Sequence, residues 1–469
     1  MPGLHNVAEV ATDVLVPGLK FTLPESASYV LGRKMSTFFP QGSNIYSPDT
    51  GTRLIRFVIS DATQMFDLST MRLAFQLNNT NGTRPMRVTG DPGMCWFQRI
   101  RVYVGGTLCE DIMYNHRVAS MYQKLKPPAK AWSDSMSLLG QTTDSATNVN
   151  WQSYYSGGPS NAQIPAAESL TIVTPIFCGL CQTHYMLPGQ FPITLELELV
   201  NNANLCLPLG AVASNPLQPA TPGLFSQNFN ITQPRILMDC VQVDVTIQNE
   251  IRTHLAAGKP LQLALSTWST TMHSVLTAGG VGSQSWDVTL SRAFARVKDI
   301  YITFDNDASR GVVNTEASNF ISWHGKPDLN VYGASNPYED DYGEGFRFQL
   351  QTGAMVFPDL PITSHAEAFY QLSKSLAMQS HNEGVSIPPG EYLGQNFILA
   401  LDLEKMYSSP GAGFVRFSGL NTQGAGDTLR MTFQNINARS PDWLPTRQFV
   451  TLHHDVVVEL RAEGVICLD

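Results

Sequence analysis

The chain has 469 residues, of which 43% are hydrophobic and 15% are charged, and its formal net charge is −9. This length and hydrophobic content allow two sizeable cores, so two domains are the default expectation. The negative charge argues against a protein that binds nucleic acid mainly through phosphate contacts, because that affinity comes from Lys and Arg. The densest basic cluster, Lys124, Lys126 and Lys130, is interpreted as cations after the end of a helix rather than as a nucleic-acid patch.

The sequence also bears on the compartment in which the protein is made. At the N-terminus no positively charged segment precedes an apolar one, so no secretory signal is visible. No stretch is long and apolar enough to span a bilayer. The seven cysteines, an odd number scattered over the chain, do not resemble the disulfide framework of a secreted protein. We therefore expect synthesis in a reducing, intracellular compartment.

In chain order, an extended arm is predicted before the first strands. Prolines interrupt residues 1–44, and no long periodic pattern is present there. Strand patterns follow in residues 54–59 and 71–77, and the second of these alternates apolar and polar side chains, which indicates one buried face. Asn81 and Gly82 tolerate positive φ angles, so we expect a turn after that strand.

A tight hairpin is predicted next. Residues 99–104 and 107–112 both have strand character, and Gly105 and Gly106 between them supply the two residues of a hairpin turn.

Two capped helices are predicted, one in each half of the chain. The first, residues 112–125, has Glu110 and Asp111 at its start, and two prolines end it. The second, residues 365–379, begins with Ser364 in capping-box spacing with a glutamate. Both helices are short and are expected to lean on a sheet edge.

The chain presents one order of elements twice: a capped helix, an alternating strand that ends in Asn, and a second long alternating strand. These are residues 112–125, 192–201 and 235–247 in the first half, and residues 365–379, 427–435 and 449–461 in the second. About eight strands per half, joined by long connections, favour a double-sheet jelly roll over an up-and-down barrel. We predict an all-β fold of two consecutive eight-stranded antiparallel jelly rolls, each with a short helix and long inter-strand insertions.

The predicted domains are an N-terminal arm at residues 1–44, a first jelly roll at 45–250 and a second at 251–469, with the join near 247–258. Insertions of the length seen here usually form binding or contact surfaces. They are expected at residues 134–169, 201–228 and 305–347, and the first carries Trp151, Tyr154 and Tyr155.

Two pairs of residues of metal-ligand type are interpreted as structural rather than as metal ligands. Cys178 and Cys181 form a single CxxC motif, but a structural zinc needs four ligands, so buried core thiols are preferred over a metal site. His453 and His454 are adjacent on a predicted strand, so they point to opposite faces and do not easily share a metal. His454 lies on the same face of the predicted strand as Val456 and Val458, which predicts a core histidine.

An acidic cluster is the strongest candidate for chemistry. Its carboxylates could bind calcium or act as a pair in glycoside hydrolysis, although a solvated loop is the preferred interpretation. The cluster, in NPYEDDYGEGF, consists of Glu339, Asp340, Asp341 and Glu344.

Two further sets of residues give weak signals. Gly279, Gly280 and Gly282 lack the strand before and the helix after that a phosphate loop needs, so they predict a turn. Three sequons for glycosylation are predicted to be unmodified; they contain Asn78, Asn81 and Asn230. No nucleophile elbow or Ser-His-Asp arrangement can be assembled. We predict no catalytic residue, no cofactor-binding residue and no metal ligand.

Several segments resemble the double jelly-roll major capsid proteins of double-stranded DNA viruses, in particular polinton-like viruses and virophages, and more distantly the nucleocytoplasmic large DNA viruses of algae. The order of the segments carries the resemblance, which spans roughly residues 45–469. The segments are TPIFCGLCQTHYMLPGQFPITLELELVNN at 174–202, PRILMDCVQVDVTIQNEI at 234–251, ARVKDIYITFDN at 295–306, DLEK at 402–405 and SGLNTQGAGDTLRMTFQN at 418–435.

The resemblance implies a structural protein of the virion and not an enzyme. Three chains would place six jelly rolls in a pseudohexameric capsomer, and capsomers would tile an icosahedral shell. The implied partners are further copies of the chain, penton proteins and minor capsid or cement proteins, with an internal membrane as a further candidate. No cofactor and no sequence-specific nucleic-acid binding are implied. The alternative is a glycan-binding or glycan-cleaving double β-sandwich that acts through the aromatic residues at 151–155 and the acidic cluster.

Overall fold

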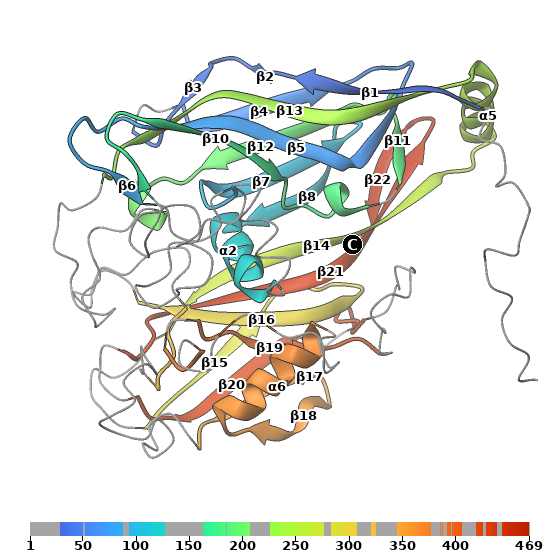
Figure 1. Ribbon diagram of the computed structural model, residues 1–469. Coiled ribbons are helices and arrows are strands. Elements are labelled where there is room, and N and C mark those ends of the chain that lie inside the picture. Colours follow the sequence, from blue (N-terminus) through green and yellow to red (C-terminus); the bar gives the residue numbers. More distant parts are fainter. Residues whose placement is uncertain are drawn as a thin grey trace, which may run out of the picture.

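The computed structural model describes residues 29–49, 52–87, 93–126, 163–183, 185–206, 226–275, 283–306, 320–324, 345–376, 385, 387, 392–394, 396–405, 419–424, 428–438 and 443–468. These residues form two β-sheet systems, one above the other in Figure 1. Strands from the first half of the chain build the upper system, and strands from the second half build the lower one.

The described part of the first half contains two large sheets and the short β6–β9 pair, and all of their strand pairs are antiparallel. Their principal strands follow the orders β1-β13-β5-β10 and β2-β4-β12-β7-β8. The bounds in the first sheet are β1 (Val30–Phe38), β13 (Phe229–Val243), β5 (Met65–Asn79) and β10 (Ser169–Pro175), with β3 (Ile45–Tyr46) beside β13 and β11 (Met186–Pro188) beside β5. Those in the second are β2 (Pro40–Gln41), β4 (Leu54–Ile59), β12 (Ile193–Leu199), β7 (Phe97–Val104) and β8 (Thr107–Met113). Smaller elements are β6 (Met86–Arg87), β9 (Gln163–Ile164) and the 3₁₀ turns η2 (Leu180–Gln182) and η3 (Ala203–Leu205).

The second half contains two sheets of the same kind. The strand orders are β14-β21-β16-β19 and β15-β20-β17-β18, and β22 pairs with β21. The bounds in the first sheet are β14 (Leu261–Ser274), β21 (Arg447–Arg461), β16 (Val297–Asp305), β19 (Leu399–Asp402) and β22 (Gly464–Leu468). Those in the second are β15 (Gln284–Leu290), β20 (Leu429–Ile436), β17 (Arg347–Thr352) and β18 (Met355–Ile362).

The two halves share one strand order. In the first half the strands β1, β4, β5, β7, β8, β10, β12 and β13, numbered 1 to 8, form the paths 1-8-3-6 and 2-7-4-5. The strands β14 to β21, numbered in the same way, form the same two paths. A helix follows the fifth strand in each half. Two facing antiparallel sheets with this order are a jelly roll, so the predicted double jelly roll is confirmed.

Local sequence explains most of the strands. In β12 burial alternates strictly, with the leucines inside and the glutamates toward solvent, as predicted. The hairpin of β7 and β8 turns at Gly105 and Gly106, whose φ angles are 56° and 86°. Both values lie in the left-handed region that favours glycine, which confirms the predicted two-residue turn.

The two predicted helices are present, the first with a later start than predicted and the second with an earlier end. The first is α2 (Asn115–Leu125), and the residues Glu110 and Asp111, expected at its beginning, lie instead in strand β8. The second is α6 (His365–Ser375), in which the Ser364 hydroxyl accepts the Glu367 N–H. The Glu367 carboxylate accepts the N–H of Thr363, so the capping interactions predicted at this end are made.

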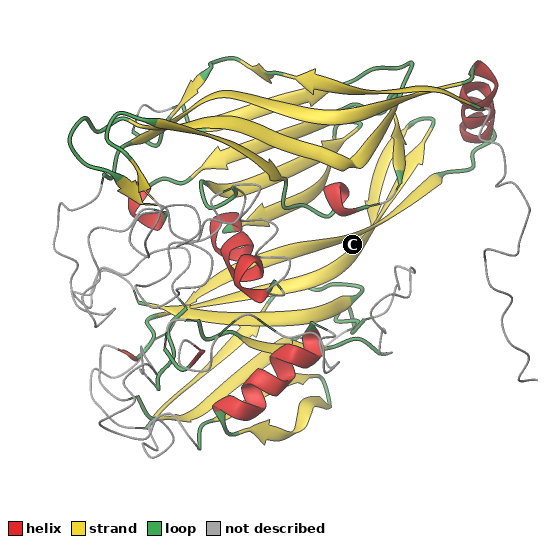
Figure 2. Cartoon of the chain, viewed as in Figure 1, coloured by secondary structure: helices red, strands yellow, loops and turns green. Residues whose placement is uncertain are grey.

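A third helix was not predicted. The strand expected at 235–247 ends at Val243, and α5 (Val245–Ala256) follows it. Asp244 caps α5, because its carboxylate accepts the N–H of Thr246 at 2.9 Å. Figure 2 shows α5 at one end of the molecule, beyond the ends of the strands. The predicted join between the halves, near 247–258, falls in this helix and the turn after it.

The N-terminal part of the chain also differs from the expectation. Residues 1–44 were expected to form an arm, yet β1 pairs along its length with β13 and is an integral strand of the first jelly roll. Apolar and polar residues do not alternate along β1, and its apolar side chains include exposed ones. The strand therefore had no periodic signal.

Each jelly roll encloses a hydrophobic core, but the cores do not divide at the middle of the chain. The first core includes Leu263, Leu265 and Trp268 of β14 and Val456 and Leu460 of β21, although these strands belong to the second jelly roll. The ends of β14 and β21 therefore reach across and close the first core. None of the helices in the described part of the chain combines the length and apolar character that crossing a bilayer requires.

Candidate functional sites

The junction between the two jelly rolls holds a buried ion-pair network. Arg117 of α2 lies 3.2 Å from Asp305 at the end of β16, and their side chains are 4% and 2% exposed. Arg447 of β21 binds the same carboxylate, with Nε 2.7 Å from Oδ1. Arg117 also donates to Thr303 Oγ1 at 3.1 Å. Burial lowers the pKa of Arg117 to about 10, and Asp305 opposes that effect. The network joins the helix of one jelly roll to the sheet of the other.

A second buried carboxylate also joins the two halves. Glu110 of β8 accepts the N–H groups of Gly179 and Leu180 at 2.7 and 2.6 Å, and the hydroxyl of Thr267 on β14 at 2.6 Å. Burial raises the pKa of Glu110, and the three donated bonds oppose that rise. A Cβ at Gly179 would lie 2.2 Å from the Ser266 carbonyl oxygen, so the turn packs directly on β14.

Aromatic rings pack together at the same junction. Trp268 of β14 lies 4.2 Å from the Phe177 ring, and the ring of His453 stacks on it at 5.3 Å, measured between centroids. The Trp268 Nε1–H donates to the hydroxyl of Tyr122 on α2 at 2.9 Å. One tryptophan thus contacts a strand of its own jelly roll and two elements of the other.

Titratable side chains lie next to these rings. Asp455 pairs with Lys298 at 2.9 Å, and His453 Nδ1 lies 3.2 Å from Asp299 Oδ2. Burial raises the pKa of Asp299 well above its ordinary value, and the nearby Asp402 raises it further. Burial lowers the pKa of His453 to about 4. In the described ranges, no group of three or more His, Cys, Asp or Glu residues is placed to hold a metal ion.

The CxxC cysteines and the histidine pair lie where the sequence predicted. Cys178 and Cys181 are buried thiols in the first core, with Sγ atoms 3.1 Å apart. His454 is buried with its ring 4.4 Å from that of Phe294, which confirms a core histidine. His453 faces the junction, on the opposite side of the strand.

The lysines near the end of α2 have structural partners. Lys124 is buried, donates to Asn396 of the second half and lies 5.2 Å from the Phe320 ring. Lys126 donates to Gln123 within the helix. Neither forms a basic surface patch, and Lys130 lies outside the described residues.

Other predicted candidates are only partly described. Asn78 donates to Asn230 Oδ1 at 2.7 Å across β5 and β13, and the Asn81 side chain accepts the N–H of Thr83 in the predicted turn. The following candidates lie outside the described residues: Trp151, Tyr154, Tyr155, Gly279, Gly280, Gly282, Glu339, Asp340, Asp341 and Glu344.

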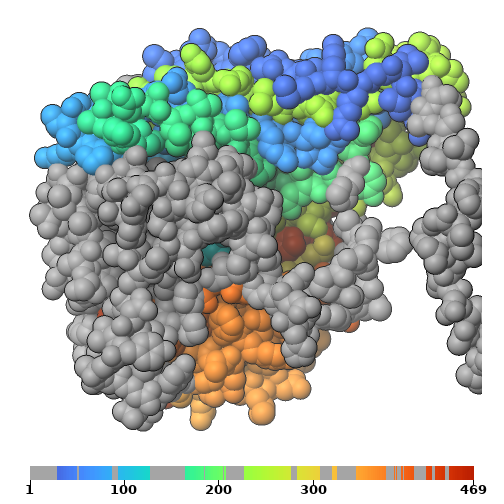
Figure 3. Space-filling model, viewed as in Figure 1, coloured from blue at the N-terminus to red at the C-terminus, as the bar shows by residue number. Residues whose placement is uncertain are grey.

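The outward side of the β1–β3 segment carries exposed apolar side chains, which we call the β1 face. Met35 and Phe39 are 67% and 70% exposed, and Leu31 and Ile45 are also exposed. These elements are the blue strands along the upper edge of the molecule in Figures 1 and 3. In the described part of the chain β1 pairs only with β13, so its other edge is open. Exposed apolar side chains beside an open strand edge make the β1 face a candidate interaction surface.

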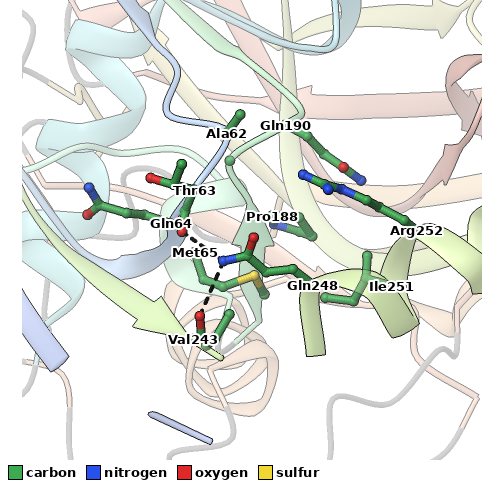
Figure 4. A pocket seen from close by; sticks show the side chains of 11 residues that line it. Ala62, Thr63, Gln64, Met65, Pro188, Gln190, Val243, Gln248, Ile251 and Arg252 are labelled. Atoms are coloured by element: carbon green, nitrogen blue, oxygen red, sulfur yellow. Dashed lines mark hydrogen bonds between the residues drawn. The ribbon is translucent and has the colours of Figure 1, made fainter. Parts of the chain in front are cut away.

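A small pocket lies where α5 meets the first jelly roll, between the segments at 62–65 and 188–190 and the helix (Figure 4). Gln248 Nε2 donates to the carbonyl oxygens of Thr63 and Val243 at 3.1 and 3.2 Å. These bonds hold α5 against the end of the sheet.

Comparison with known proteins gives matches only at the level of structure. No family model and no curated protein matches the sequence. VP54 of PBCV-1, fitted into a reconstruction of the virophage Sputnik, has a TM-score of 0.59 and 10% identity over 95% of this chain and 98% of that one. The Faustovirus major capsid protein has a TM-score of 0.58 and 12% identity, covering 96% and 93%. A structure of the Sputnik virophage has a TM-score of 0.51 and 12% identity, covering 97% and 92%. The chain has the fold of these viral proteins, as its resemblance to double jelly-roll capsid proteins implied.

The junction network was missed by sequence reasoning. Arg117 is an ordinary polar residue in the expected helix, and Glu110 is one just before it. Asp305 and Thr267, which they bind in the other half, lie more than a hundred residues away. By contrast, α5 had a detectable signal, since Asp244 stands directly before a helix-compatible segment in the capping position.

Proposed function

We propose that the chain is a major capsid protein of a double-stranded DNA virus, which assembles as a homotrimer and tiles an icosahedral shell as a pseudohexameric capsomer. The observation that carries the proposal is the presence of two jelly rolls with one strand order in a single chain. Three such chains present six similar barrels, so a threefold molecule can fill a site with six neighbours. The similarity of the whole chain to viral capsid structures supports the same role.

The junction supports this role physically. Arg117, Glu110 and Trp268 connect the two jelly rolls through buried contacts, and strands of the second jelly roll complete the first core. Such contacts hold the barrels in a fixed relation, which a repeating tile needs. We propose that the chain acts by assembly and not by catalysis. Its proposed division into two jelly rolls falls within α5.

We propose that the protein resides in the virion shell and contacts neighbouring capsomers, penton proteins and minor capsid or cement proteins. An internal membrane is a further proposed partner. The glycan-binding alternative depends on residues outside the described part of the chain, and no structural observation favours it.

Assembly of the purified protein tests the proposal. Size-exclusion chromatography with light scattering is expected to give three times the 51.5 kDa chain mass. Negative-stain images are expected to show hexagonal capsomers or shells. A chain that remains monomeric at high concentration and forms neither would contradict the proposal.

We further propose that the β1 face contacts a second copy of the chain. Glutamate at exposed Met35 and Phe39 would place charge in that contact, so the double variant Met35→Glu/Phe39→Glu is expected to lower the assembled fraction. Val245→Glu is the matched control, because Val245 is an exposed apolar residue at the start of α5, where glutamate is compatible with the helix. Equal assembly of both variants and wild type would exclude the β1 face while leaving the capsid proposal intact.

A further inference from the structure

The last strand of the chain returns to the first jelly roll. Strand β22 pairs with β21 of the second jelly roll and lies beside β8 of the first, as the red and blue-green strands in Figure 1 show. The Thr107 hydroxyl donates to the Val465 carbonyl oxygen at 2.8 Å. A Cβ at Gly105 would lie 2.6 Å from the Val465 side chain, so the two strands are in close contact.

A cysteine lies two residues after this contact on each of the two strands. Cys109 is two residues beyond Thr107 on β8, and Cys467 is two residues beyond Val465 on β22. Residues two apart on a strand share a face. Cys109 therefore lies on the same side of β8 as Thr107, and Cys467 lies on the same side of β22 as Val465, so the two thiols are near each other. Cys467 Sγ lies 3.8 Å from the Cys109 carbonyl oxygen. The neighbouring Cys467 side chain, together with burial, raises the pKa of Cys109.

We propose that Cys109 and Cys467 are a modification site, at which a disulfide oxidant such as oxidised glutathione forms an intrachain disulfide. Both residues are thiols in the structure. Cys109 is buried and Cys467 is partly exposed, so the oxidant reaches Cys467 first. The inference goes beyond the proposed capsid role and does not depend on it.

The reaction balances as two thiol–disulfide exchanges. The Cys467 thiolate attacks one sulfur of oxidised glutathione and expels one glutathione thiolate. Cys109 then loses its proton and attacks Sγ of Cys467, which expels the second glutathione. Two S–H bonds are lost and one S–S bond forms, while two electrons and two protons convert oxidised glutathione into two molecules of glutathione. The thiolate is the attacking species, so the reaction is expected to be faster at pH 8.5 than at pH 7.

The position of the bond determines its effect. It would join residues 358 apart in the chain, and long closed loops lose the most conformational entropy in the unfolded state. The bond would also fasten β22, and through it the second jelly roll, to β8 of the first. A protein made in a reducing compartment and later exposed to an oxidising one would gain this bond after folding.

The test uses the full-length chain, folded and then incubated with oxidised glutathione. Peptide mass spectrometry is expected to find the Cys109–Cys467 linkage. The oxidised chain is expected to migrate faster on a non-reducing denaturing gel, because the closed loop makes it more compact. Its melting temperature is expected to rise by about 5 °C over the reduced form. Cys467→Ser and Cys109→Ala are each expected to lose all three effects.

The variant Cys178→Ser/Cys181→Ser is the matched control. Those thiols are also close together, with Sγ atoms 3.1 Å apart, but a bond between them would close only a very short loop. The control is expected to keep the linkage, the gel shift and the stabilisation. Circular dichroism under reducing conditions establishes that each variant folds. Complete alkylation of both Cys109 and Cys467 after native oxidation would overturn the proposal, and so would a linkage found only between two copies of the chain.

Discussion

At the scale of single residues, Asp305 is the carboxylate shared by an arginine from each half of the chain. Its side chain is 2% exposed, with Arg117 and Arg447 on its two oxygens. Removing one partner of a buried ion pair leaves the other charge uncompensated, which is far more costly than losing a surface pair. Asp305→Ala is therefore expected to lower the free energy of unfolding by about 3–5 kcal/mol in denaturant titrations.

The matched control for that variant is Asp287→Ala. Asp287 pairs with Arg430 at 2.9 Å, but the two side chains are 45% and 53% exposed. Exposed pairs contribute less than about 1 kcal/mol, so the control is expected to be near wild type. Equal losses in the two variants would show that burial at the junction is not the source of the effect.

A buried histidine in the same region predicts how stability depends on pH. Burial, with Arg117 and Arg447 nearby, lowers the pKa of His116 to about 3 from its ordinary 6.5. The unfolded chain therefore binds a proton at a pH where the folded chain does not. Stability from the neutral ring is fully present above pH 6.5 and is lost as pH falls toward 3. At pH 5 the loss is about 2 kcal/mol.

Replacing the histidine isolates this contribution. His116→Gln removes the titration, so the change in unfolding free energy between pH 7 and pH 5 is expected to be smaller in the variant than in wild type. The measurement is denaturant unfolding at both pH values. A variant whose pH dependence matched that of wild type would rule out His116 as the source.

At the scale of elements, the turn after β11 shows how closely two segments approach near α5. Gly189 donates its N–H to the Gln64 carbonyl oxygen at 2.9 Å, and an added Cβ would lie 1.8 Å from the Asp61 carbonyl oxygen. Since that neighbour is backbone, relief requires movement of a whole segment. Gly189→Ala is expected to cost about 1–3 kcal/mol or more in thermal or denaturant unfolding.

Gly82→Ala provides the comparison for Gly189→Ala. An added Cβ at Gly82 meets nothing within 4 Å, and the residue lies in an exposed turn. This variant is expected to unfold like wild type. A loss in Gly82→Ala as large as that in Gly189→Ala would mean that crowding is not the cause.

At the scale of the whole molecule, the cores predict that the two halves do not fold separately. Leu263 and Leu265 of β14 and Val456, Val458 and Leu460 of β21 belong to the first core. A fragment that ends at residue 257 lacks all of them and leaves apolar surface uncovered. It is expected to bind a hydrophobic dye and to lack a cooperative melting transition. Co-expression with residues 258–469 is expected to abolish the dye binding and to restore the cooperative melting of the intact chain. A cooperatively melting fragment would contradict this expectation.

The sequence by itself determined the elements whose signals are local. The alternation in β12, the paired glycines of the β7–β8 turn and the cap at Ser364 each involve neighbours in the chain, and they predicted the correct structure. The doubled order of these elements was enough to indicate two jelly rolls. Local patterns carry this much because burial of one face dictates which positions are apolar.

Only the tertiary structure decided which elements meet and what the exceptions do. Strand β1 exposes apolar residues and α5 buries only Leu255 in its length, so neither has the one-sided pattern that identifies an element. Arg117 meets Asp305 across 188 residues of sequence, and Cys109 meets Cys467 across 358. A sequence pattern records that a face is covered, but the partner that covers it is determined by packing between segments that are distant in the chain.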